Sequence, residues 1–151
     1  MQNNSSSLNK SRRFFNHNGK GLKNALVIDD QKIDCFIAEK FILQYDQHAS
    51  VQSFNTVSSA LRHLRKLKKA DFPDLIVLDM KLPIYNGNFF IRELLKLRQF
   101  DPGQCRLLPV SCYTSFFDPN VQQRLKEVFP FMPECRQKPL SREMIEEVIA
   151  Y

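Results

Sequence analysis

The stretch DLIVLDMKLP, residues 74–83, places four apolar residues in succession directly before an acid. Such a run of leucine and β-branched residues between polar ones is typical of a strand that is covered on both faces in a parallel sheet. Asp79 would then lie at the carboxyl end of the strand, the edge where open α/β sheets bind their ligands. The stretch therefore predicts a buried parallel strand that ends on a reactive acid.

Strand-like and helix-like segments alternate along the rest of the chain. Further strands are expected at 24–30, 49–54, 107–113 and 131–136. Helices are expected at 33–45, from the cap residue Thr56 to about Lys69, at 87–97, at 119–129 and at 138–151. The fifth strand is the weakest, because Pro130 and Pro133 bracket it and proline cannot donate to a sheet ladder. Five alternations predict an α/β fold in which helices cover both faces of a five-stranded parallel sheet.

Apolar spacing predicts which side of each helix is buried. In the helix expected at 33–45, a spacing of three and four residues predicts a buried stripe of Ile33, Phe36, Ile37, Phe41 and Ile42. In the helix expected at 87–97, the inward residues would be Phe90, Ile91, Leu94 and Leu95. The basic run at 62–69 shares a helix with regularly spaced leucines, so its charges are expected on a solvated face.

The net charge of +6 is concentrated at the start of the chain. Residues 1–23 carry five basic residues and no acid, which leaves 17 basic against 16 acidic side chains in the remainder. We therefore expect a disordered basic leader at 1–23 and one nearly neutral domain at 24–151 that does not bind nucleic acid.

The composition also indicates a cellular compartment. The chain has no apolar run that could span a bilayer, and its first residues are polar where a secretory signal would be hydrophobic. Its four cysteines form no C-x-x-C pair and no histidine stands at a metal-finger spacing from them, so free thiols are expected. These features predict a soluble cytoplasmic protein without a membrane partner.

Reactive side chains follow the predicted strands: Asp29 and Asp30, Asp79, Thr114 and Ser115, and Lys138. The carboxyl ends of parallel strands meet at one edge, so these side chains are expected to converge in one pocket. Three carboxylates in one pocket repel one another unless a cation offsets their charge, and a site that offers only oxygen ligands suits Mg²⁺. A carboxylate beside Mg²⁺, a lysine and a hydroxyl is equipped to attack phosphorus, with Asp79 as the nucleophile.

Four segments together resemble the receiver domains of bacterial two-component response regulators: LVIDD, DLIVLDMKLPIYNG, PVSCYTS and KPLSREMIEEVI. The resemblance covers about residues 24–151 and implies a flavodoxin-like sheet with strand order 2-1-3-4-5. It implies that Asp79 accepts a phosphoryl group from a histidine kinase or a phosphotransfer protein. The chain would then be a phosphoacceptor that assists its own phosphorylation and dephosphorylation, and not an enzyme with a separate substrate.

The resemblance also implies roles for the other site residues. The Mg²⁺ ligands would be Asp29, Asp30, Asp79 and the backbone carbonyl of Lys81. Thr114 would be the switch hydroxyl that closes on the phosphoryl group, and Lys138 would pair with that group.

One position departs from the receiver pattern. Receivers commonly carry an aromatic residue three positions before the lysine, and this chain has Cys135 there. A switch region would then involve Cys135 with Phe116 or Phe131. The departure keeps open a second function, an interaction module that has the receiver fold but works without phosphorylation. A third, an aspartate-nucleophile phosphohydrolase, would need an acid where this chain has Lys81.

The chain ends with the fifth predicted helix, so no DNA-binding output module is expected. The signal would pass to an unknown protein through a surface formed by about residues 118–151.

Overall fold

The computed structural model describes residues 21–112 and 117–150. Its five strands are all parallel and lie in the order β2-β1-β3-β4-β5, which confirms the predicted fold class. The strands are β1 Asn24–Ile28, β2 Ser50–Phe54, β3 Leu75–Asp79, β4 Arg106–Ser111 and β5 Arg136–Gln137. The helices are α1 Lys32–Tyr45, α2 Val57–Lys66, the 3-10 turn η1 Lys69–Asp71, α3 Gly87–Leu94, α4 Pro119–Val128 and α5 Arg142–Ala150.

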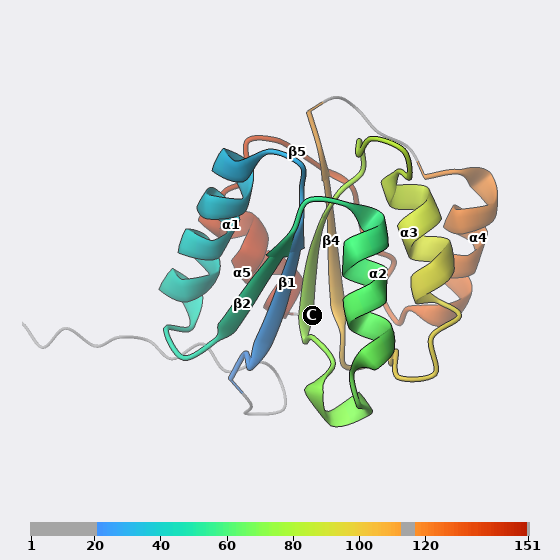
Figure 1. Ribbon diagram of the computed structural model, residues 1–151, viewed down its shortest axis with the longest axis horizontal. Helices are drawn as coiled ribbons and strands as arrows, with labels where there is room; N and C mark the ends of the chain where they lie inside the picture. Colours follow the sequence, from blue (N-terminus) through green and yellow to red (C-terminus); the bar gives the residue numbers. More distant parts are fainter. Residues whose placement is uncertain (1–20, 113–116, 151) are drawn as a thin grey trace, which may run out of the picture.

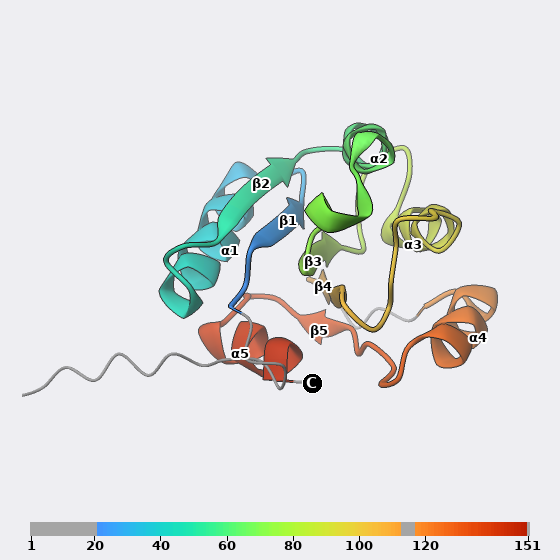
Figure 2. The ribbon, with the colours of Figure 1, turned by 90° about the horizontal axis from the view of Figure 1, so that it is seen from below.

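The sheet separates two helical layers. Figure 1 and Figure 2 show α1 and α5 together on one face, and α2, α3 and α4 on the other. Each layer has its own apolar cluster, and successive residues of β3 alternate between them: Ile76 and Leu78 join the α2–α4 side, Leu75 and Val77 the α1–α5 side. Both faces of β3 are therefore buried, which is why its sequence is apolar without interruption.

Polar residues start the helices of the second layer. Thr56 caps α2 as predicted, because its hydroxyl accepts a hydrogen bond from the Ser59 N–H at 3.1 Å. Asn86 caps α3 in the same way, with the Phe89 N–H as donor at 3.0 Å. The predicted inward residues of α3 are confirmed for Phe90, Ile91 and Leu94, which are fully buried.

The predicted buried stripe of α1 is confirmed at its end and wrong at its start. Ile42 is fully buried and Phe41 packs against the same cluster, but Ile33 and Phe36 are both 63% exposed, and Cys35 and Ala38 are buried instead. The thiol of Cys35 donates a hydrogen bond to the backbone carbonyl of Asp29 at 3.3 Å, which turns this side of the helix toward β1. Small side chains at Cys35 and Ala38 allow a close approach that the larger Phe36 would prevent.

Several element boundaries also differ from the prediction, and three have a clear physical cause or consequence. β5 is the pair Arg136–Gln137, and not 131–136, because Pro130 and Pro133 cannot donate ladder hydrogen bonds. Helix α2 ends at Lys66 and a separate 3-10 turn follows, whereas the prediction ran to about Lys69. Helix α5 starts at Arg142, beyond Pro139.

The start of the described chain is fixed to the sheet. Leu22, inside the segment assigned to the leader, is 6% exposed and packs in the α1–α5 cluster. The carboxylate of Asp74 accepts hydrogen bonds from the backbone N–H groups of Lys23 at 2.7 Å and Asn24 at 3.1 Å. The leader residues 1–20 lie outside the described residues. Among the described helices, none combines the length and the apolar composition that crossing a bilayer requires.

Candidate functional site

Three strand ends bring the candidate site together. Asp29 directly follows β1, Asp79 is the last residue of β3, and Lys138 directly follows β5. Backbone hydrogen bonds fix the first and the last of these ends. The N–H of Asp29 donates to the carbonyl of Phe54 at 3.1 Å, and the N–H of Lys138 donates to the carbonyl of Ser111 at 2.8 Å. Residues more than a hundred positions apart in the sequence are thereby brought to one edge of the sheet.

The acidic part of the site consists of Asp29, Asp30 and Asp79. One carboxylate oxygen from each lies within 4.8 Å of the others. Asp29 and Asp79 are 4% and 5% exposed, whereas Asp30 is exposed. Oxygen donors that converge on a partly open position suit a hard divalent cation that keeps several waters, so the donor set fits Mg²⁺.

Lys138 is the cation that the protein itself supplies to this cluster. Its Nζ lies 2.7 Å from a carboxylate oxygen of Asp29, 2.9 Å from one of Asp34 and 3.4 Å from one of Asp79. Burial alone would lower the pKa of Lys138, but the hydrogen bonds to Asp29 and Asp34 outweigh burial and raise the pKa above its usual value. The lysine is therefore a permanent positive charge at the acidic cluster.

Burial acts on the Asp29 carboxylate in the opposite sense. Burial raises the pKa of Asp29, and the hydrogen bonds that it accepts from Lys138 and from the Gln31 N–H oppose the rise only in part. In Asp79, one carboxylate oxygen accepts the Lys81 N–H at 2.9 Å while the other faces Lys138. These contacts orient the Asp79 carboxylate between a backbone donor and an ammonium group.

Asp34 is a member of the site that the sequence analysis missed. It lies in the first turn of α1, and its side chain is 32% exposed. The predicted stripe of α1 assigned the inward side of the helix to Ile33 and Phe36, so Asp34 had no place in the pocket. The signal that could have identified Asp34 is its place in the first turn of the helix that directly follows Asp29 and Asp30.

The remaining predicted residues are only partly placed. Thr114, Ser115 and Phe116 lie outside the described residues, so the predicted switch hydroxyl stays a prediction. The N–H of Lys81 contacts Asp79, and the predicted role of its carbonyl as a ligand also stays a prediction. Cys135 is half-buried and packs against the α2–α4 cluster, whereas Phe131 is 64% exposed.

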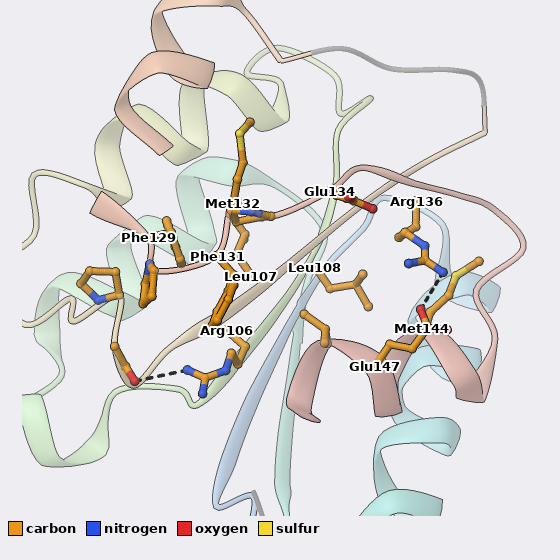
Figure 3. A pocket seen from close by; sticks show the side chains of 15 residues that line it. Arg106, Leu107, Leu108, Phe129, Phe131, Met132, Glu134, Arg136, Met144 and Glu147 are labelled. Carbon is orange, nitrogen blue, oxygen red and sulfur yellow. Dashed lines mark hydrogen bonds and ion pairs between the residues drawn. The ribbon is translucent and has the colours of Figure 1, made fainter. Parts of the chain in front are cut away.

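A cavity of about 790 Å³ lies apart from the acidic cluster, between β4, the segment 129–136 and α5. Figure 3 shows Phe131 and Met132 on one side of it and Met144 and Glu147 of α5 on another. The cavity exists because β5 pairs with β4 only at Val110 and Ser111, so the first half of β4 has no strand on the side opposite β3. Most of its lining residues belong to the surface 118–151 that the sequence analysis assigned to protein contact, and the others lie at 102–108.

Comparison with known proteins gives structural relatives only. No protein-family model matches the chain, and no curated protein matches its sequence. Among solved structures, the response regulator receiver protein from Dyadobacter fermentans is 26% identical, with a TM-score of 0.61, and the match covers 85% of this chain and 99% of that one. A two component response regulator from Cytophaga hutchinsonii is 20% identical, with a TM-score of 0.65 and coverage of 85% and 95%. The chemotaxis protein CheY4 from Vibrio cholerae is 20% identical, with a TM-score of 0.61 and coverage of 84% and 95%.

These relatives confirm the resemblance found in the sequence. They are CheY-like response regulator receivers and cover most of the chain. The chain therefore has the fold of a response regulator receiver domain, with its acidic cluster at the carboxyl edge of the sheet.

Proposed function

We propose that this chain is a receiver that accepts a phosphoryl group on Asp79, with Mg²⁺ as cofactor. The observation that supports the proposal best is the position of Lys138, whose ammonium group contacts both Asp29 and Asp79. The buried Asp79 supplies the nucleophile, and Lys138, whose side chain is 10% exposed, supplies a positive charge for phosphoryl oxygens. An aspartate that only capped a helix would need neither.

The phosphoryl donor would be a phosphohistidine on a histidine kinase or a phosphotransfer protein. An oxygen of the Asp79 carboxylate attacks phosphorus, the P–N bond to the histidine breaks, and the imidazole keeps the electron pair of that bond. Lys138 would donate a hydrogen bond to a phosphoryl oxygen in place of its contact with Asp79. Mg²⁺ held by Asp29, Asp30 and Asp79 would neutralise charge on the phosphoryl group. Water later attacks the phosphorus of the acyl phosphate, the P–O bond to Asp79 breaks, and inorganic phosphate leaves as the carboxylate is restored.

The exposed side of α1 supports a protein donor. Ile33 and Phe36 lie on the first turns of α1, close in sequence to Asp30, and Ile84 and Tyr85 follow Asp79 on the loop before α3. All four are large apolar side chains with high exposure, from 43% for Tyr85 to 92% for Ile84. Apolar side chains around a charged pocket suit a protein partner better than a small ion.

The downstream partner is proposed to be another protein that binds within residues 118–151. The cavity between β4 and α5 gives this surface an apolar depression with Met132 and Met144 in its wall. Methionine side chains adapt to irregular apolar partners, which supports a protein contact there.

The test is phosphorylation by a small donor. The native chain and Asp79→Asn are incubated with Mg²⁺ and phosphoramidate, and their intact masses are compared over time. The expected result is the gain of one phosphoryl group by the native chain alone, and its prevention by a chelator. Val27→Ala, a control in β1 outside the pocket, should still gain the group.

Two results would refute the proposal. Phosphorylation of Asp79→Asn at the native rate would place the acceptor elsewhere. Failure of the native chain to gain the group or to bind beryllofluoride would favour the receiver-like interaction module that works without phosphorylation.

A further inference from the structure

Lys138 has one carboxylate partner that the proposed reaction does not require. An ammonium group has three hydrogens to donate, and Asp29, Asp34 and Asp79 match that number. Asp29 and Asp79 belong to the acidic cluster, but Asp34 does not. Asp34 holds Lys138 more closely than Asp79 does, at 2.9 Å against 3.4 Å.

We infer that Asp34 is a positioning residue, which holds the ammonium group of Lys138 on the α1 side of the pocket and so weakens the binding of a phosphoryl group at Asp79. The inference rests on the proposed function. It assigns Asp34 an effect on the stability of the phosphorylated state, and not a contact with the phosphoryl group.

The distances indicate how the restraint works. A phosphoryl group on Asp79 would accept a hydrogen bond from the Lys138 ammonium. The hydrogen for this bond is the one that now makes the longest contact, 3.4 Å to Asp79. The close contacts to Asp29 at 2.7 Å and Asp34 at 2.9 Å restrain the ammonium group from moving toward a phosphoryl oxygen. The Asp29 side chain is 5% exposed and also accepts the Gln31 N–H, so it is fixed by the fold. Asp34 is the restraint that a substitution can remove without changing the cluster.

The charges act in the same direction. Asp29, Asp30, Asp34 and Asp79 carry four formal negative charges against the single positive charge of Lys138, a net charge of −3 that bound Mg²⁺ would reduce to −1. A phosphoryl group is itself an anion and is repelled by this negative excess. Removal of the Asp34 charge would bring the net charge with Mg²⁺ to zero and leave more of the lysine charge for the phosphoryl oxygens.

Asp34→Asn tests the inference, because asparagine keeps the shape of the side chain and loses its charge. Beryllofluoride, a mimic of the phosphoryl group, is titrated in the presence of Mg²⁺ and followed by ¹⁹F NMR. A half-buried charge pair supports a change of about threefold to tenfold in affinity, so the variant should bind beryllofluoride tighter by about that factor. Glu39→Gln is the matched control: it removes the same charge from an exposed position of the same helix and should leave the affinity unchanged.

A second measurement separates positioning from a structural role. The side-chain ¹H–¹⁵N signal of the Lys138 ammonium should move in Asp34→Asn and stay in place in Glu39→Gln. A purely structural ion pair would instead lower the urea midpoint of Asp34→Asn and leave its affinity for beryllofluoride unchanged.

The outcomes are distinct. Tighter binding in Asp34→Asn alone, with a displaced ammonium signal, supports the inference. Equal affinity in the native chain and Asp34→Asn, or equal tightening in Asp34→Asn and Glu39→Gln, overturns the inference and leaves the proposed function standing. If the native chain neither binds beryllofluoride nor accepts a phosphoryl group, the proposed function fails and the inference fails with it.

Discussion

Gly87 occupies a position where the packing leaves no room for a side chain. It is the first residue of α3, and its N–H donates a hydrogen bond to the backbone carbonyl of Met80 at 3.1 Å. A Cβ atom at Gly87 would lie 2.8 Å from the Cα of Met80 and 2.5 Å from its Sδ. The Met80 side chain can turn away, but its Cα can move only with the backbone that directly follows Asp79. Gly87→Ala therefore perturbs both the α3 start and the proposed acceptor.

The size of the effect follows from two opposing terms. Carbon atoms in contact prefer a separation of about 3.5–4.0 Å, so the Gly87–Met80 contact must open by roughly 0.7 Å or more. Such overpacking costs about 1–3 kcal/mol, and the better helix propensity of alanine offsets up to about 1 kcal/mol. We expect Gly87→Ala to lose about 1–2 kcal/mol of unfolding free energy, which lowers the melting temperature by roughly 3–8 °C in a domain of this size.

Urea unfolding followed by circular dichroism measures this loss. Gly103→Ala is the control, because its Cβ would meet only the side-chain oxygen of Asp101, at 3.2 Å, and that atom can move away. Its unfolding free energy should stay within about 0.5 kcal/mol of the native value. A Gly87→Ala variant as stable as the native chain would refute the reasoning, since it would mean that the loop between Met80 and α3 yields without strain.

Two further predictions concern ionisation and thiol chemistry. Because the pKa of Asp29 is raised in the folded state, the folded chain binds this proton more tightly than the unfolded chain does. The protonated group therefore adds stability below about pH 3.8, and this contribution is lost as the pH rises through the folded pKa. The unfolding free energies of Asp29→Asn and of the native chain are both measured in a chelator. The free energy of the variant should rise relative to that of the native chain between about pH 4 and pH 7, and a difference independent of pH would contradict this assignment. Iodoacetamide at pH 8 should modify exposed Cys112 first and half-buried Cys135 next, because burial raises the pKa of Cys35 and Cys105 and hides their thiols. Peptide mass mapping identifies the modified residues. Modification of Cys35 or Cys105 in the folded protein would contradict their burial.

The strand ends of the site were predictable because they depend on local patterns. The apolar run before Asp79 requires burial on both faces, and only a central parallel strand offers that. Asp29 and Lys138 likewise stand directly after segments that pair with the sheet. Once the strands are parallel, the meeting of Asp29, Asp79 and Lys138 at one edge follows from topology alone.

The inward side of α1 was not predictable in this way. Ile33 and Phe36 share the spacing of the buried Ile42, but Cys35 and Ala38 take the inward positions at the start of the helix. A helix with apolar residues on more than one side gives no unique answer from spacing, and the space available beside β1 selects the smaller side chains.

The sequence by itself determined the parallel α/β fold, the strand order through its resemblance to receivers, and the placing of Asp79 at a strand end. These properties follow from the alternation of elements and from runs of apolar residues, which act over a few neighbouring positions. The tertiary structure decided the rotation of α1, the late start of β5 and the entry of Asp34 into the contacts of Lys138. These depend on which side chains fit between elements far apart in the chain, and that competition for space is settled only when the layers pack together.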